Sequence, residues 1–274
     1  MKKFLCVLCS VFLFTGCSSD AVKNVSVTKS TELQTEEVTT EVITELATEE
    51  KVSDVNIYEK QTYREVLEDI YYNYKFPQYD ESLKNYDYDI SNNEFAVYDV
   101  DNDGRDELIF MFTESCTAGM LGLIYDHNSS ENLVLQFSGY PMMDFYANGS
   151  VKVYSAHNQT HSKFHPFTMY SYDKETDLYN EYGIVYALDK DIVDMVNQEK
   201  EEAGMTDFWN YPEEYDTSNS GTVYYIRPDW DKGAEIPLDV TEFNERCEQF
   251  TEGSEVLNIQ FLKLTEKNIK TVSQ

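Results

Sequence analysis

Apolar side chains recur at helical spacing in three stretches of the chain. The first stretch predicts an amphipathic helix that ends before Pro77, and its apolar positions are Tyr63, Val66, Leu67, Ile70, Tyr71 and Tyr74. A second helix is predicted over 192–204 and ends at Gly204. A third is predicted over 240–250, because Asp239 and Glu242 stand as a capping pair and Gly253 follows as a stop.

Short apolar runs separated by turn residues predict strands along most of the remaining chain. The predicted strands are 95–100, 108–112, 121–125, 133–137, 144–146, 151–154, 167–172, 179–186, 223–226 and 257–264. Asn148-Gly149 favours a tight hairpin turn, since both positions tolerate positive φ. Strands that follow one another without intervening helices form antiparallel sheets. We therefore expect an α+β fold, mainly an antiparallel β meander with an N-terminal helix and two C-terminal helices.

The N-terminal residues have the pattern of an export signal. Two lysines at 2–3 precede the apolar run 4–14, which is shorter than the roughly 20 residues needed to cross a bilayer. The run ends in Phe-Thr-Gly-Cys at 14–17, which resembles the lipobox of bacterial lipoproteins, with phenylalanine where leucine is more usual. This resemblance implies a signal peptide over 1–16 and a diacylglycerol, with palmitate-type acyl chains, on Cys17. An ordinary secretory signal cut elsewhere is the alternative.

The segment 17–55 is rich in Thr, Glu, Val and Ser and poor in aromatic residues. Such a composition buries too little apolar surface to offset its ordering entropy, so we predict a disordered stalk behind the lipidated cysteine. A short amphipathic helix is the alternative. Residues 56–274 have the length of one folded unit, which we interpret as a single α+β domain.

The chain is strongly acidic, with 51 Asp and Glu against 21 Lys and Arg and a formal net charge of -30. A surface of this sign repels phosphate backbones, so nucleic acid is not an expected partner. Of five cysteines, two lie in the signal segment and Cys17 is the lipidation site. Cys116 and Cys247 remain, and outside the cytoplasm they could form a disulfide. Alternatively, Cys247 serves as a small hydrophobe on the apolar stripe of its helix.

One segment carries specific chemistry, the sequence Asp-Val-Asp-Asn-Asp-Gly-Arg-Asp-Glu at 99–107. Carboxylates at positions 1, 3 and 5 can converge on one hard cation, glycine at position 6 permits the turn, and oxygens at positions 7 and 9 complete the cage. The expected ligands are Asp99, Asp101, Asp103, the carbonyl of Arg105, and Glu107. Four carboxylates this close repel one another without a counterion, so we expect a structural Ca²⁺. An acidic turn without an ion is the alternative.

The flanks of this loop read as strands, and Phe110 stands where an EF-hand has its bidentate Glu. The loop therefore resembles the strand–loop–strand calcium sites of FG-GAP/VCBS repeats, with the pattern DxDxDGxx[DE]L. The stretch 60–270 is similar to lipoproteins of Gram-positive bacteria that join a lipobox, a polar stalk and one such loop. The segments 222–226 and 264–269 also carry this similarity. The family has no assigned activity, so the resemblance implies only the location and the metal loop.

Other candidate sites are weaker. His157, His161 and His165 recur every four residues, but Pro166 disfavours a helix there, so zinc binding would need the loop to bring them together. The segment 216–221 echoes the acidic loop with hydroxyls in place of two carboxylates, and we interpret it as a turn with its own side-chain hydrogen bonds. Sequence motifs of hydrolases, zinc proteases, P-loops and dinucleotide folds are absent.

These patterns lead to an expected function outside the cell. We expect a lipoprotein tethered through its N-terminal lipid to the extracellular face of the bacterial cell membrane. Its domain is expected to be calcium-stabilised and non-catalytic, with an extracellular glycan or protein as ligand. The alternative is an extracellular hydrolase that acts on polysaccharide or cell-wall material, through carboxylates or through His157 and His161. A third reading is a lipoprotein that serves partners in an envelope complex.

Overall fold

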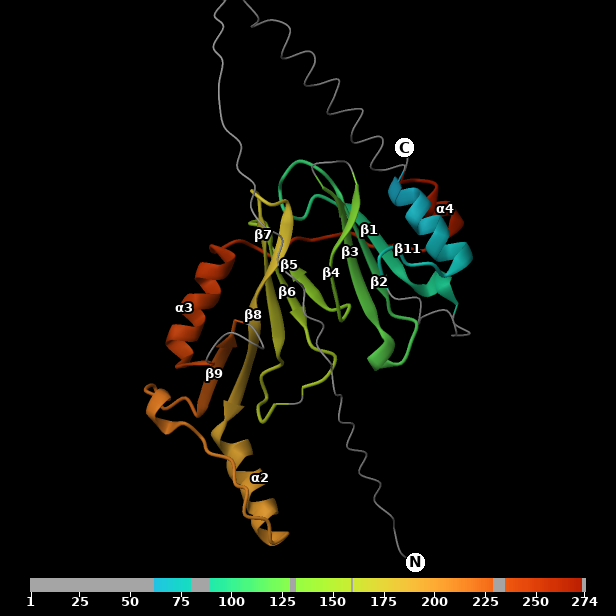
Figure 1. Ribbon diagram of the computed structural model, residues 1–274. Helices are drawn as coiled ribbons and strands as arrows, with labels where there is room; N and C mark the ends of the chain where they lie inside the picture. The colour runs from blue at the N-terminus through green and yellow to red at the C-terminus, as the bar shows by residue number, and fades with distance from the viewer. Residues whose placement is uncertain (1–61, 80–88, 129–131, 159, 229–234, 273–274) are drawn as a thin grey trace, which may run out of the picture. The chain divides into compact units, whose positions relative to one another are not determined.

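The computed structural model describes residues 62–79, 89–128, 132–158, 160–228 and 235–272 (Figure 1). The predicted signal peptide, the predicted lipidation site Cys17 and the predicted stalk lie outside these residues. No helix among them combines the length and apolar character that a membrane span needs.

The first sheet of the described chain has the strand order β11-β1-β2-β3-β4, and every neighbouring pair is antiparallel. Its strands are β1 (Glu94–Tyr98), β2 (Glu107–Phe112), β3 (Leu121–His127), β4 (Leu133–Gly139) and β11 (Leu262–Lys263). All residues of β2 and β3 are buried, because both faces of these central strands are covered.

The second sheet has the order β10-β9-β8-β7-β6-β5 and is also antiparallel throughout. Its strands are β5 (Met143–Phe145), β6 (Ser150–Tyr154), β7 (Phe167–Asp173), β8 (Leu178–Asp189), β9 (Thr222–Arg227) and β10 (Ile236–Leu238). The predicted α+β fold with an antiparallel meander is confirmed, and the meander is divided between two sheets.

The two faces of the first sheet bury two different cores. On one face, the helix at 62–73 packs Tyr63, Leu67 and Ile70 against β2 and β3, and α4 (Glu266–Ile269) joins the same cluster (Figure 1). The predicted end of this first helix is confirmed, since Tyr74 leaves the helix with a φ of 51°. On the other face, side chains such as Ile109 pack against the second sheet.

Helix α3 (Val240–Thr251) covers the face of the second sheet that points away from the first sheet. The Phe243 ring stacks on Tyr224 of β9 at a centroid distance of 4.0 Å. The carboxylate of Asp239 accepts the Thr241 N–H, as predicted for an N-cap, and Gly253 follows the helix with a φ of 67°. Helix α2 (Lys190–Glu202) is confirmed too, but it lies between β8 and β9 rather than after the meander.

The predicted strand over 257–264 is wrong for most of its length. Only Leu262 and Lys263 pair with β1, and Val256 forms a single bridge to Tyr146. The alternation of apolar residues has another cause: Leu257, Ile259 and Phe261 pack against the core between the sheets while the chain crosses from one sheet to the other.

The predicted strand 121–125 ends too early, because Asp126 and His127 belong to β3 and are buried. The carboxylate of Asp126 accepts the main-chain N–H of His127 and the side-chain amide of Gln136. These hydrogen bonds allow a charged residue inside a buried strand, which the sequence pattern does not indicate.

Candidate metal centre

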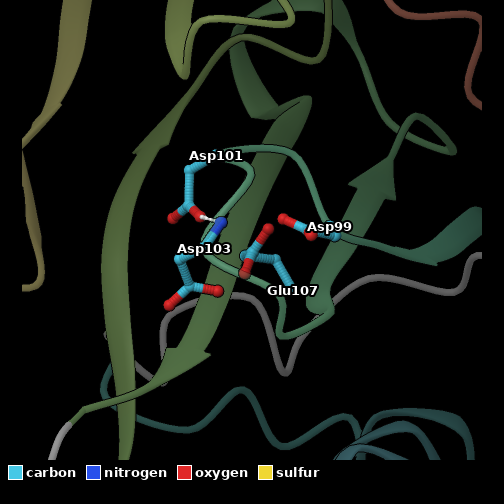
Figure 2. A group of neighbouring side chains, drawn as sticks. All are labelled: Asp99, Asp101, Asp103 and Glu107. Carbon is cyan, nitrogen blue, oxygen red and sulfur yellow. Dashed lines mark hydrogen bonds between the residues drawn. The ribbon is translucent and has the colours of Figure 1, made fainter. Parts of the chain in front are cut away.

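The loop between β1 and β2 brings four carboxylates together, those of Asp99, Asp101, Asp103 and Glu107 (Figure 2). One oxygen of each lies within 4.8 Å of the others. Asp101 and Glu107 are buried, with exposed fractions of 1% and 0%, whereas Asp99 is half-buried. Within the ranges that the structure describes, no other group of three or more Asp, Glu, His or Cys side chains is arranged to hold a metal ion. The predicted carboxylates therefore converge as a set.

Main-chain N–H groups fix the carboxylates of this loop. Asp99 accepts from Asn102 at 2.8 Å and from Gly104 at 3.1 Å, and Asp101 accepts from Asp103 at 3.1 Å. Asn102 and Gly104 take the left-handed φ values of 61° and 95° that this tight path requires. The loop is thus shaped by its own hydrogen bonds before any cation binds.

Three buried oxygens at this place have no hydrogen-bond donor or acceptor among the described residues: Asp101 Oδ2, Glu107 Oε1 and the hydroxyl of Tyr179. The other oxygen of Glu107 accepts the Val100 N–H at 2.6 Å. Tyr179 comes from β8 of the second sheet. Its burial and the nearby charges of Asp101 and Glu107 raise the pKa of its hydroxyl. A buried carboxylate oxygen without a partner is costly, and a bound cation removes that cost. The donor set, all oxygen, suits a hard cation.

The raised pKa values of Asp101 and Glu107 also favour a bound cation. Burial, together with the negative charge of Asp103, raises the pKa of Asp101 to about 8 in the absence of a cation. Burial and the nearby Asp101 raise the pKa of Glu107 to about 11. A divalent cation inverts this situation, because it favours the deprotonated form of every carboxylate that contacts it.

The side chain of Arg105 has a role that the sequence did not reveal. Its Nε donates to Asp103 Oδ2 at 2.8 Å, its Nη2 donates to Asp177 Oδ1 at 2.7 Å, and its Nη1 donates to the His127 carbonyl. Asp177 is 72 residues away in the sequence, so no local pattern could have indicated this contact. The predicted role of the Arg105 carbonyl as a metal ligand stays a prediction.

The three histidines are not assembled into a site. The His161 ring stacks on Trp209 at 3.9 Å, and Nε2 of His165 lies 2.7 Å from the Ser155 carbonyl. His157 is exposed. None of them belongs to the metal-competent group found in the described ranges.

The other sequence candidates also have plain structural roles. Asp216 accepts hydrogen bonds from the main chain of Ser220 and Gly221 and from the Tyr211 hydroxyl, so its loop has the side-chain hydrogen bonds of its own that the sequence indicated. Cys116 is exposed, Cys247 is half-buried, and both are free cysteines.

A scan against protein-family models found no match, and searches of curated proteins and of solved structures found no significant similarity. The fold and the site therefore have to define the class of protein by themselves. They define a β-rich α+β domain that carries an acidic loop able to hold a metal ion.

Proposed function

We propose that the chain is a membrane-tethered extracellular lipoprotein whose folded domain binds a ligand and is stabilised by calcium. The observation that carries this proposal is the convergence of four carboxylates with two buried oxygens that lack a donor among the described residues. The lipobox-like residues at 14–17 and the polar segment that follows support the tether. The domain is proposed to be non-catalytic.

Calcium is the cation that suits this loop best. Zinc prefers nitrogen and sulfur ligands, whereas this group offers carboxylate oxygens alone. Magnesium requires near-ideal octahedral geometry and retains several waters, while calcium accepts a flexible cage of six to eight oxygens. Extracellular modules bind calcium at roughly 10⁻⁴ to 10⁻³ M. An ion of that affinity would be held as a structural part of the domain.

Exposed aromatic side chains support a binding role. Phe208 and Trp209 follow α2 and are 52% and 43% exposed. The side-chain amide of Asn197 holds the main chain of Trp209 through two hydrogen bonds, of 2.8 Å and 2.7 Å. Ordered and exposed aromatic rings are common at recognition surfaces, for glycans as for proteins. An extracellular glycan or protein is the proposed ligand.

Thermal unfolding of the purified protein tests the calcium proposal. Melting would be followed by circular dichroism in chelator, in millimolar calcium and in millimolar magnesium. For a dissociation constant of roughly 10⁻³ to 10⁻⁴ M, we expect about 1 mM calcium to stabilise the native protein by about 0.4 to 1.4 kcal/mol. Magnesium should have a much smaller effect. Asp101→Asn should lose the calcium-induced shift, because it removes one of the two buried oxygens without a donor in the described structure.

Asp106→Asn is the matched control, since Asp106 lies in the same loop but outside the converging group. It should keep the full calcium-induced shift. An unchanged melting temperature of the wild-type protein in all three conditions would contradict the calcium site. Turnover of cell-wall polysaccharide by the purified protein would contradict the non-catalytic part of the proposal.

A further inference from the structure

The metal loop of the first sheet is in direct contact with two turns of the second sheet. At the β5–β6 turn, a Cβ added to Gly149 would lie 3.3 Å from the Asp101 carbonyl oxygen and 3.4 Å from its Cα. At the β7–β8 turn, the Tyr172 hydroxyl donates to Asp177 Oδ1 at 2.7 Å and lies 3.4 Å from Asp103 Oδ2. The predicted cation site is therefore part of the interface between the two sheets.

Arg105 connects the elements of this interface. Its guanidinium binds Asp103 in the metal loop, the His127 carbonyl at the end of β3, and Asp177 in the β7–β8 turn. The side chains of Arg105, Asp103 and Asp177 are only 23%, 15% and 15% exposed. The planar guanidinium of Arg105 has acceptors on three elements, so it has little freedom to move. A displacement of Asp103 would therefore move the Arg105 side chain and, with it, the other two acceptors.

The β7–β8 turn has a second attachment to the first sheet. The side-chain amide of Gln136 in β4 donates to the Asp177 carbonyl at 3.1 Å and accepts the Tyr179 N–H at 3.1 Å. Asp177 itself has a left-handed φ of 59°, an uncommon conformation for a residue other than glycine. The turn is closed by its own hydrogen bonds, from the Asp177 N–H to the Asp173 carbonyl at 2.8 Å and from the Glu175 N–H to Asp173 Oδ1 at 2.9 Å. Its contacts with Gln136 and Arg105 attach it to the opposite sheet.

We propose that Arg105 is a positioning residue that couples calcium occupancy of the loop to the β7–β8 turn. The inference rests on the proposed calcium site. A bound cation holds Asp103 from one side while Arg105 holds it from the other. Without the cation, Asp103 loses its attachment on the side of the metal, and Asp103 and the Arg105 guanidinium no longer share a fixed geometry. Calcium then orders the turn of the second sheet as well as its own loop.

Hydrogen exchange on the full chain tests this coupling. In the wild-type protein, calcium should slow main-chain exchange at residues 172–178 by about tenfold relative to chelator. Arg105→Lys keeps the charge but cannot bind Asp103, Asp177 and the His127 carbonyl at once. We expect this variant to bind calcium about tenfold more weakly, the loss typical for residues that orient metal ligands, and to lose the calcium-induced protection of the turn.

Two further variants make the result specific. Arg246→Lys is the matched control, because Arg246 is partly exposed on α3 and, among the residues that the structure describes, forms an ion pair with Glu242 of the same helix alone. It should behave as wild type in both measurements. Asp177→Asn removes the charged acceptor in the turn and leaves the four carboxylates in place. It should keep calcium affinity within about twofold and lose the calcium-induced protection at 172–178.

The possible outcomes separate the two proposals. A wild-type protein that binds no calcium would overturn both. A wild-type protein that binds calcium, with an Arg105→Lys variant that keeps both the affinity and the protection of the turn, would overturn the coupling alone. A merely structural role for Arg105 would lower the melting temperature equally in calcium and in chelator and leave the calcium-induced difference in exchange intact. That result would also overturn the coupling.

Discussion

At the scale of single residues, Gly149 is the point where the second sheet meets the metal loop. Its φ of 81° lies in the left-handed region, and a Cβ added there would make tight contacts of 3.3 Å with the Asp101 carbonyl oxygen and with Tyr172 Cβ. The hairpin expected at Asn148-Gly149 is found, but its turn differs from the expected one: the Gly149 N–H donates to the Tyr146 carbonyl at 2.9 Å, and only Gly149 of the pair has a positive φ. Both demands, on conformation and on space, are met by glycine alone.

Gly149→Ala should therefore destabilise the protein for two reasons. A left-handed alanine costs roughly 1 to 2 kcal/mol, and the contact of its Cβ with the Asp101 main chain adds about 1 to 3 kcal/mol. Gly204→Ala is the matched control, since Gly204 has a φ of 73° and nothing within 4 Å of an added Cβ. Urea unfolding of both variants in calcium measures the difference. Equal losses in the two variants would contradict the close packing of the turn on the loop.

The ligand set could be predicted from the sequence because its four carboxylates lie within nine residues. The burial and the long-range contacts of these carboxylates could not be predicted from the sequence. Asp101 is buried by contacts with Gly149, and Tyr179 reaches the same place from a strand of the other sheet. Asp177, the partner of Arg105 in the β7–β8 turn, is 72 residues away in the sequence. Local spacing thus predicts which residues converge, whereas burial and long-range ion pairs depend on tertiary packing.

At the scale of elements, α3 begins at an N-cap that also binds a separate loop. Asp239 accepts the Thr241 N–H of its own helix at 2.9 Å and the Ser218 N–H at 2.9 Å. These hydrogen bonds favour the charged carboxylate and lower the pKa of Asp239 to about 2. The cap therefore joins the start of α3 to the segment that precedes β9.

This depressed pKa predicts a pH dependence of stability with a definite sign. The contribution of Asp239 is present above the pKa of an unfolded aspartate, about 3.8, and is lost as the pH falls toward 2. Asp239→Asn keeps a capping oxygen but does not titrate. Denaturant unfolding between pH 6 and pH 2.5 should show a constant stability difference between wild type and variant above about pH 5, which shrinks below pH 4. A difference that is independent of pH would contradict the role of the charged carboxylate.

Elements were predictable where the signal is local. The N-cap of α3 and the glycines that follow α2 and α3 depend on neighbouring residues, and they are found. The Asn-Gly pair located the β5–β6 hairpin but did not predict its turn geometry. The segment 257–261 was misread, because apolar alternation has the same period whether an extended chain joins a ladder or crosses a core. Strand β10 was not predicted, since its three residues, Ile236–Leu238, include a proline and are too short for any periodicity.

At the scale of the whole described domain, two glycines lie where the two sheets pack closely against each other. Gly122 and Gly139 are paired in β3 and β4, and an added Cβ would lie 2.5 Å from Met143 Cε at the first and 2.5 Å from Val153 Cγ1 at the second. Strands β5 and β6 of the second sheet can pack this closely only because these positions lack side chains. Whether a strand continues one sheet or starts the next depends on such face-to-face contacts, which hairpin patterns do not encode.

The proposed tether makes a prediction for the intact molecule. With a formal net charge of -30, the chain as a whole is repelled by anionic lipids, so its membrane attachment would depend on the lipid proposed at Cys17. Two or more acyl chains give durable attachment where one gives marginal binding. Bacteria that express the wild-type chain and are fed labelled palmitate should yield labelled protein that begins at Cys17.

Cys17→Ser should remain unlabelled and should keep residues 1–16, because processing at a lipobox follows acylation of the thiol. Cys116→Ser is the matched control, since Cys116 is a free and exposed cysteine of the folded domain, and it should be labelled and cut as the wild type. The mass of the N-terminal peptide and the label are measured on the same samples. A wild-type protein that starts elsewhere and carries no lipid would mean an ordinary secretory signal. The domain would then be a secreted protein, and the calcium site, which depends only on the folded residues, would be unaffected.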